Sequence, residues 1–384
     1  MSNASKHVLI VAGEASGDLH GSNLVSAMKK IDPEISIRGI GGDKMMDAGV
    51  DILAHASDMA VVGLTEAISK LHFIYKTSLG LKRLIKNSRP DLLILIDYPD
   101  FNINLARTAR QCSVPVLYYV SPQIWAWRSG RIKKIAARVD RMAVILPFEK
   151  EFYRDSDLKV DYVGHPLLDS VPKGLDRDQL VVDMDLNGAS PVIGFLPGSR
   201  KEEVLSLLPV MVKAAEALAS HYPGLKCIIP VAPTISPELV LSIIGQSDLD
   251  IRISRSDIYK TLAVCDLALV ASGTATLETA IMEVPMVIIY KISPLSYWIG
   301  KKIINVPYIG LVNLIAGKEV VPELVQKEVT PEIIEKEVIA ILGDNPRREL
   351  IINDLKMVKH RLGSGGASER TARIAMEMIE NFSQ

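Results

Sequence analysis

Two carboxylates follow a short, fully apolar run of strand length. The run Leu92 to Ile96 ends in Asp97-Tyr98-Pro99-Asp100, and open α/β sheets bind their ligands at the carboxyl ends of such strands. An aspartate there can take a proton from a substrate hydroxyl if its pKa is raised. The alternative role is the N-cap of the next helix, which we predict to begin near Asn102. Asp100 is better placed for that cap, which leaves Asp97 as the candidate general base.

The first apolar run, His7 to Ala12, leads into a turn rich in small residues, Gly13 to Asp18 (GEASGD). Small residues let a ligand approach a helix N-terminus, whose free N–H groups favour anions. An ordinary tight turn is the alternative, and the dinucleotide fingerprint GxGxxG is absent because the glycines have the wrong spacing. Folding does not require a carboxylate at the tip of such a turn, so Glu14 is a candidate functional residue.

Two turns in the second half of the chain repeat this pattern, each between an apolar run and a predicted helix. They would present N–H groups to a diphosphate, together with the permanent charge of one arginine. A glycine-containing turn with a surface arginine is the alternative for the first, and a carboxylate that complements the helix dipole is the alternative for Glu278. Two such turns in one domain favour nucleotide binding. The candidate residues are Gly198, Ser199, Arg200, Ser272, Gly273, Thr274 and Glu278.

Composition excludes several classes of function. The 44 basic and 45 acidic residues leave a net charge of −1, whereas nucleic-acid binders usually carry a basic domain. Mean hydropathy is high at +0.21, yet no apolar run approaches the roughly 18–20 residues of a membrane-spanning helix, and Val8 to Ala12 is too short for a signal peptide. Three scattered cysteines predict a reducing, cytoplasmic location. Metal-ligand spacings and GxSxG are absent, so we expect no metal and no serine hydrolase.

Alternation of strands and helices predicts an α/β fold with two Rossmann-like, doubly wound domains facing a cleft. The predicted strands are residues 7–12, 35–40, 92–96, 114–120 and 142–146 in the first set, and 192–196, 226–230, 266–271 and 286–290 in the second. We interpret the polar stretch Asp169 to Pro191 as a linker. The expected domains are residues 1–168, residues 169–345, and C-terminal helices over 346–384 that can pack back on the first domain.

Two segments of the first domain combine basic and apolar residues. Between Met59 and Lys86 the only acid is Glu66, against five basic residues, and several apolar residues lie on one helical side. Trp125 to Arg141 carries six basic residues and one aspartate behind two tryptophans. Buried core faces with solvated lysines are one explanation for each segment. Their joint presence favours an amphiphilic, anionic partner such as a membrane surface.

These motifs together resemble the lipid-A-disaccharide synthase family over about residues 7 to 330. The matching segments are VAGEASGD (Val11 to Asp18), IDYPDFN (Ile96 to Asn102), YVSPQIWAWR (Tyr119 to Arg128), LPFE (Leu146 to Glu149), VGHP (Val163 to Pro166), LPGSR (Leu196 to Arg200), ASGTATLE (Ala271 to Glu278) and LVNLIAG (Leu311 to Gly317). The resemblance implies a peripheral, metal-independent, inverting glycosyltransferase of the GT-B type, without a cofactor, at the inner face of the cytoplasmic membrane of a Gram-negative bacterium. Its oligomeric state stays open, with a homo-oligomer as one option.

The resemblance also implies substrates and roles. The enzyme would join UDP-2,3-diacylglucosamine to 2,3-diacylglucosamine 1-phosphate through a β-1,6 linkage and release UDP, with Asp97 as the base on the acceptor 6-hydroxyl. Arg200 and the Ser272 to Glu278 turn would hold the nucleotide with Asn313 nearby, and Glu14 and Ser16 would line the cleft. The alternatives are another UDP-sugar transferase or an epimerase on the same fold, and a non-catalytic membrane-surface protein that retains a nucleotide fold.

Overall fold

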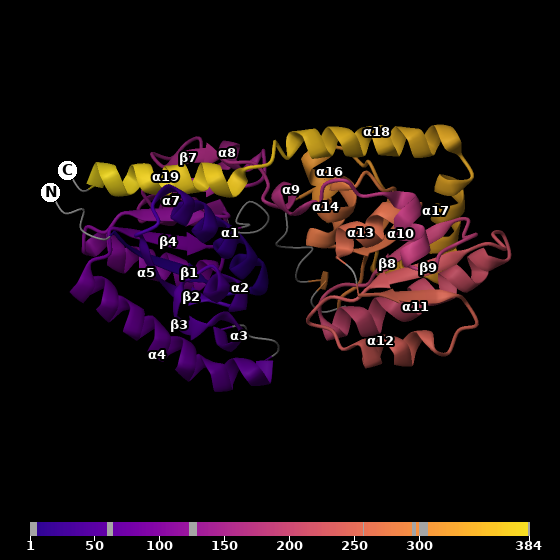
Figure 1. Cartoon of the computed structure of the whole chain (residues 1–384), viewed down its shortest axis with the longest axis horizontal. Coiled ribbons are helices and arrows are strands. Elements are labelled where there is room, and N and C mark those ends of the chain that lie inside the picture. Colours follow the sequence, from indigo (N-terminus) through magenta and orange to yellow (C-terminus); the bar gives the residue numbers. More distant parts are fainter. Residues whose placement is uncertain are drawn as a thin grey trace. The chain divides into compact units, whose positions relative to one another are not determined.

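The computed structural model describes residues 6–59, 64–122, 129–255, 257–293, 297–298 and 306–382; for Ala15, residues 64–71 and Ser129 it describes the backbone only. The chain forms two compact units (Figure 1). Unit 1 comprises Met1–Asp169 and Leu362–Gln384, and unit 2 comprises Ser170–Arg361. Each is an α/β unit built on one parallel sheet.

Unit 1 contains a seven-stranded parallel sheet in the order β3-β2-β1-β4-β5-β6-β7. Its strands are β1 (His7–Ala12), β2 (Ser36–Gly41), β3 (Asp51–His55), β4 (Leu92–Ile96), β5 (Val116–Tyr119), β6 (Arg141–Val144) and β7 (Lys159–Tyr162). The helices are α1 (Ala15–Ile31), α2 (Asp43–Asp47), α3 (Ala56–Met59), α4 (Leu64–Ser88), α5 (Pro99–Gln111), η1 (Ser129–Arg131), α7 (Ile132–Ala136), α8 (Glu149–Phe152), α9 (Leu167–Ser170) and the C-terminal α19 (Ala367–Phe382).

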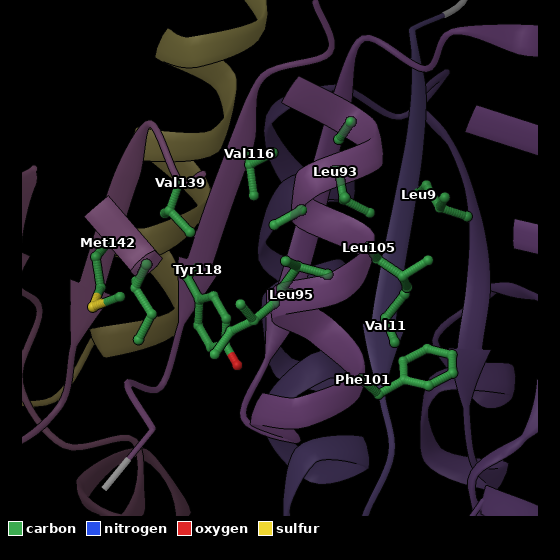
Figure 2. Close-up of a cluster of buried hydrophobic side chains, with 14 of the residues drawn as sticks. Leu9, Val11, Leu93, Leu95, Phe101, Leu105, Val116, Tyr118, Val139 and Met142 are labelled. Atoms are coloured by element: carbon green, nitrogen blue, oxygen red, sulfur yellow. The ribbon is translucent and has the colours of Figure 1, made fainter. Parts of the chain in front are cut away.

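The core of unit 1 follows from alternation along the central strands. Residues two apart on a strand point to the same face, so one face of β1, β4 and β5 meets the apolar side of α5, as Figure 2 shows. Because helices cover both faces of this sheet, its central strands are apolar throughout, and all five residues of β4 are buried. The labelled members of this cluster are Leu9, Val11, Leu93, Leu95, Phe101, Leu105, Val116, Tyr118, Val139 and Met142.

Unit 2 contains a six-stranded parallel sheet in the order β10-β9-β8-β11-β12-β13. Its strands are β8 (Val192–Leu196), β9 (Lys226–Pro230), β10 (Ile251–Ser254), β11 (Leu267–Ala271), β12 (Met286–Tyr290) and β13 (Glu323–Val325). The helices are α10 (Arg177–Asp183), α11 (Lys201–Ala219), α12 (Pro237–Ile244), α13 (Ile258–Val264), α14 (Thr274–Ile281), α16 (Leu311–Ala316), η2 (Gln326–Glu328), α17 (Pro331–Leu342) and α18 (Asn345–Arg361).

The stretch interpreted as a linker is part of unit 2. Its helix α10 is capped by Asp176, whose carboxylate accepts hydrogen bonds from the N–H groups of Asp178 and Gln179, and α10 packs on α13. The linker interpretation was therefore wrong for this stretch, because polar composition does not distinguish a capped surface helix from a loop. The chain leaves unit 1 at Asp169.

The C-terminal helices divide between the two units. Helix α18 packs on α14, α16 and α17 in unit 2, whereas α19 lies along α1 in unit 1 (Figure 1). The start of α19 is fastened by Asp169, whose carboxylate accepts from the N–H of Gly366. Arg370 donates to the carbonyls of Val163, Ser364 and Gly365. These hydrogen bonds hold the turn through which the chain returns to unit 1.

Two glycines of unit 1 provide a paired test of this packing. A Cβ at Gly39, in β2, would lie 1.7 Å from the carbonyl oxygen of Ile10 in β1, whereas a Cβ at Gly80, in α4, would meet nothing within 4 Å. We expect Gly39→Ala to destabilise unit 1 by about 3 kcal/mol, since the two strands must move apart. Gly80→Ala should stabilise it by roughly 0.5–1 kcal/mol, because alanine is the better helix former.

Urea denaturation of the two full-length variants measures this difference. Shifts of opposite sign are expected, and equal unfolding midpoints would contradict the close approach of β1 and β2 at Gly39.

Candidate functional site

Asp97 is held by its backbone at the carboxyl end of β4. Its N–H donates to the carbonyl of Tyr119 at the end of the neighbouring β5, at 3.3 Å. Its own carbonyl accepts from Asn102 Nδ2 at 2.7 Å and from the hydroxyl of Tyr118. Both partners are buried, so the main chain at Asp97 is fixed while its carboxylate remains unpaired by these contacts.

The turn at Asp97 is strained. Asp97 and Tyr98 both have left-handed backbone angles, with φ of +44° and +46°, at a cost of about 1–3 kcal/mol each for residues that are not glycine. The ring of Tyr98 occupies the space beside Gly13, where a Cβ would lie 2.6 Å from it, and the Tyr98 hydroxyl donates to the carbonyl of Met59 at 3.1 Å. Packing of Tyr98 on the first turn therefore helps to maintain the strained conformation.

The electrostatic environment makes Asp97 a stronger base than an ordinary aspartate. Burial and the negative charge of Glu14 raise its pKa to about 6, and a backbone hydrogen bond from Tyr98 opposes the shift only in part. The carboxyl is therefore ionised at neutral pH, yet its proton affinity lies near the range that suits general-base catalysis. Glu14, predicted on other grounds, acts on Asp97 through this charge; Ser16 is exposed in the first turn of α1.

The prediction that Asp100 caps the following helix was wrong. Helix α5 begins at Pro99, with Tyr98 at the N-cap position, because proline suits the first position of a helix. Asp100 lies in the first turn and forms an ion pair with Arg131 at 2.7 Å. Asn102, expected only to mark the start of the helix, instead ties the backbone of Ile96 and Asp97.

The turn after β8 contains a carboxylate of the protein itself, that of Glu203. Glu203 Oε2 accepts from the N–H groups of Ser199 and Arg200 at 3.2 and 3.3 Å. The side chain of Arg200 is 73% exposed, and its Nη1 lies 3.4 Å from Glu203 Oε1. Gly198 has φ +110°, and a Cβ there would lie 2.3 Å from the Glu203 carboxylate. Two of the amide donors predicted for a phosphate at this turn, those of Ser199 and Arg200, are therefore occupied.

The turn after β11 is different. Helix α14 begins after Gly273 without a side-chain cap, and in the part of the chain that the structure describes no acceptor is found for the N–H groups of Thr274 and Ala275. The Ser272 hydroxyl donates to the carbonyl of Ile309 at 3.3 Å, and this hydrogen bond joins the turn to the segment before α16. Two free donors at the positive end of a helix form an anion site.

Glu278 lies in the same helix as this open turn. Burial, with a smaller contribution from the charge of Asp257, raises its pKa to about 7. Near neutral pH the carboxyl is therefore present in both protonation states. Ionised, it can accept a hydrogen bond from a ligand hydroxyl, and protonated, it can donate one. Strands β8 and β11 are adjacent and pair Leu196 with Val270, so the turns carrying Arg200 and Thr274 leave neighbouring strands at the same edge.

Asn313 is buried and fully engaged within the protein. Its Nδ2 donates to the Val321 carbonyl and to Glu323 Oε1 at 2.9 and 2.8 Å, and its Oδ1 accepts from the N–H groups of Val320 and Val321. Every hydrogen-bonding site of the amide points into the fold. The side chain of Asn313 therefore supports the neighbouring loop, and its place near the nucleotide stays a prediction.

The segments predicted to meet an amphiphilic partner are described in part. Trp125 and Trp127 lie outside the described residues, as do the side chains at 64–71. Farther along α4, Ile85 is buried in the core, whereas Phe73 and Tyr75 are exposed. The helix thus uses one apolar side for the core and leaves two aromatic rings at the surface.

Within the described ranges, no helix has the length and apolar character needed to cross a membrane. The same residues contain no group of three or more His, Cys, Asp or Glu side chains arranged to hold a metal ion.

Two α/β units, each built on one parallel sheet with flanking helices, place the chain in the GT-B class. Solved structures share this fold: the UDP-GlcNAc 2-epimerase from Neisseria meningitidis has a TM-score of 0.66 at 12% identity, covering 97% of this chain and 100% of that one. The calicheamicin glycosyltransferase CalG4 has a TM-score of 0.63 at 14% identity, covering 99% and 100%. These similarities show the fold alone.

A family model described as lipid-A-disaccharide synthetase matches residues 8–376. The lipid-A-disaccharide synthase of Geobacter metallireducens is 48% identical over 375 residues, which cover 98% of both chains. The chain therefore belongs to the lipid-A-disaccharide synthase family.

The coupling between Glu14 and Asp97 can be tested without any substrate. In Glu14→Gln the pKa of Asp97 should fall below about 6, because the neighbouring negative charge is removed, yet stay above its ordinary value of 3.8, because the carboxyl remains buried. The measurement is an NMR titration of ¹³C-labelled aspartate carboxyls, with Asp97→Asn to assign the signal. Glu34→Gln, an exposed change of the same charge, is the control. An identical Asp97 titration in wild type and Glu14→Gln would contradict the coupling.

Proposed function

We propose that this chain transfers 2,3-diacylglucosamine from its UDP donor to the 6-hydroxyl of 2,3-diacylglucosamine 1-phosphate, forming a β-1,6 linkage and releasing UDP. Membership of the lipid-A-disaccharide synthase family makes the chain a glycosyltransferase. The observation that carries the proposed mechanism is the rigidly held Asp97, whose pKa is raised to about 6. A glycosyl transfer to a hydroxyl requires one such base.

In the proposed reaction Asp97 takes the proton of the acceptor 6-hydroxyl while the oxygen of that hydroxyl bonds to the anomeric carbon of the donor. The bond from that carbon to the β-phosphate oxygen breaks on the opposite side, which inverts the configuration, and its electron pair leaves with UDP. The growing negative charge of UDP is stabilised by the Arg200 guanidinium and by the free N–H groups at the start of α14. In this proposal these groups provide the compensation without a metal.

Unit 2 holds the nucleotide in this proposal. The diphosphate lies at Gly273 and Thr274, where the N–H donors are open, and Glu278 binds a ribose hydroxyl through a carboxyl whose pKa is about 7. UDP-bound relatives of the fold support nucleotide binding in general, since one solved neighbour is described as a co-structure with UDP. The Gly198 and Ser199 backbone contributes by placing Arg200.

We propose that the protein works at the inner face of the cytoplasmic membrane as a peripheral enzyme. Its acylated substrates need an apolar surface, and their phosphates are anionic. The exposed rings of Phe73 and Tyr75, next to Lys76 on α4, support this location in unit 1.

The decisive assay supplies both acylated substrates in detergent micelles and follows UDP release and disaccharide mass. Formation of both products supports the proposal. Turnover of unacylated UDP-sugars without an acceptor would indicate an epimerase on this fold, and nucleotide binding without any turnover would indicate a non-catalytic protein.

Asp97→Asn should retain UDP binding and reduce transfer by about 100- to 10,000-fold, because loss of a general base typically costs that much. In wild type, kcat/KM should rise with pH through about 6, since only the ionised carboxylate accepts a proton. Steady-state kinetics at several pH values measure both effects. Near-normal turnover of Asp97→Asn would remove Asp97 from the role of base.

Arg200→Ala should raise the KM for the UDP donor and lower kcat, because one guanidinium can make a bidentate contact to a diphosphate that an alanine cannot replace. Arg373→Ala, an exposed arginine on α19, is the control. Unchanged donor kinetics in Arg200→Ala would rule out the diphosphate contact.

A further inference from the structure

The turn between β8 and α11 is closed by a carboxylate of the chain itself. Glu203 Oε2 accepts hydrogen bonds from the backbone N–H groups of Ser199 and Arg200. On the other side of the turn, Thr234 Oγ1 donates to the carbonyl of Ser199 at 2.6 Å. A glycine is required at position 198 because the carboxylate occupies the place of a side chain there. The turn is therefore held from both sides before any ligand arrives.

This arrangement contrasts with the start of α14. There the N–H groups of Thr274 and Ala275 have no acceptor within the described part of the chain, whereas a phosphate that binds the N–H groups of Ser199 and Arg200 would have to displace Glu203. A carboxylate that holds two amide protons also repels a phosphate that approaches them. The two turns thus differ in how many amide donors are free to bind an anion, although their sequences predict an anion site at both.

The side chain of Arg200 in this turn remains available. Its side chain is 73% exposed, and only Nη1 approaches Glu203, at 3.4 Å. A guanidinium carries five N–H donors, so most of them are free. Burial raises the pKa of the hydroxyl of Tyr290 at the end of β12, the charge of Glu203 raises it further, and the charge of Arg200 lowers it. The pair therefore lies at the carboxyl edge of the sheet.

We propose that Glu203 is a positioning residue that aims Arg200 at the donor diphosphate and excludes the phosphates from the amides of its own turn. The inference rests on the proposed function, because it takes a UDP donor as the ligand. Glu203 does not touch the donor. It directs the diphosphate to the open N-terminus of α14 and limits the contact of the β8 turn to one guanidinium.

The test uses Glu203→Gln, which keeps the size of the side chain and an oxygen acceptor for the two amides but removes the charge. Glu202→Gln is the matched control, since it makes the same charge change one position earlier on an exposed side chain. We expect kcat of Glu203→Gln to fall about tenfold to a hundredfold through misplacement of the donor. UDP, titrated by calorimetry, should bind at least as tightly as to wild type, because a nearby negative charge is gone.

A double variant separates positioning from a general effect on folding. If Glu203 acts through Arg200, adding Glu203→Gln to Arg200→Ala should lower kcat by less than twofold further. Independent, multiplicative losses would overturn the proposal. So would a Glu203→Gln enzyme that matches Glu202→Gln, or one that binds UDP tenfold more weakly, since the residue would then be irrelevant or merely structural.

The calorimetric arm needs no turnover and so separates the two hypotheses. If wild type binds UDP but forms no disaccharide, the proposed function fails. In that case Arg200→Ala should still bind UDP more weakly while Glu203→Gln does not, and equal weakening in both variants would overturn the positioning role.

Discussion

The register of three neighbouring parallel strands is the constraint on which the site in unit 1 depends. Ala12 of β1 pairs with Ile96 of β4, and Ile96 pairs with Tyr119 of β5, so all three strands end at one level. The residues that follow must therefore meet at the same edge. Glu14 comes within electrostatic reach of Asp97 for this reason, and the main chain of Asp97 is held by the end of β5. A slip in this register would separate Asp97 from the groups that raise its pKa and hold its main chain.

Carboxylates determine which backbone amides remain available for a ligand. Asp18 holds the N–H groups at the start of α2, Glu323 holds those of Ile309 and Gly310 before α16, and Glu203 holds those before α11. Each removes a potential anion site by supplying an internal negative charge. Among the residues that the structure describes, no carboxylate accepts from the N–H groups at the start of α14. In the proposed function, the position of a phosphate is therefore selected as much by occupied amides as by open ones.

Sequence patterns predicted the central strands and missed the edges. The nine strands predicted from apolar runs all appear, whereas β3, β7, β10 and β13, at the four sheet edges, were not predicted. Central strands are buried on both faces and are continuously apolar. Edge strands are partly exposed and carry more polar residues, so their sequences resemble those of loops; β3 (Asp51–His55) and β7 (Lys159–Tyr162) are examples. The site shows the same limit, because Tyr118 and Asn102 support Asp97 through contacts between separate elements.

The sequence by itself determined the fold class, the family and the place of Asp97, since these follow from local apolar runs and from motifs that keep their order along the chain. Tertiary structure alone decided that the pKa of Asp97 is raised to about 6, that Asn313 faces the fold, and that Glu203 fills a turn that looked open. Those properties depend on burial and on which carboxylate reaches which amide. Such distances arise only when residues apart in the sequence are brought together by packing.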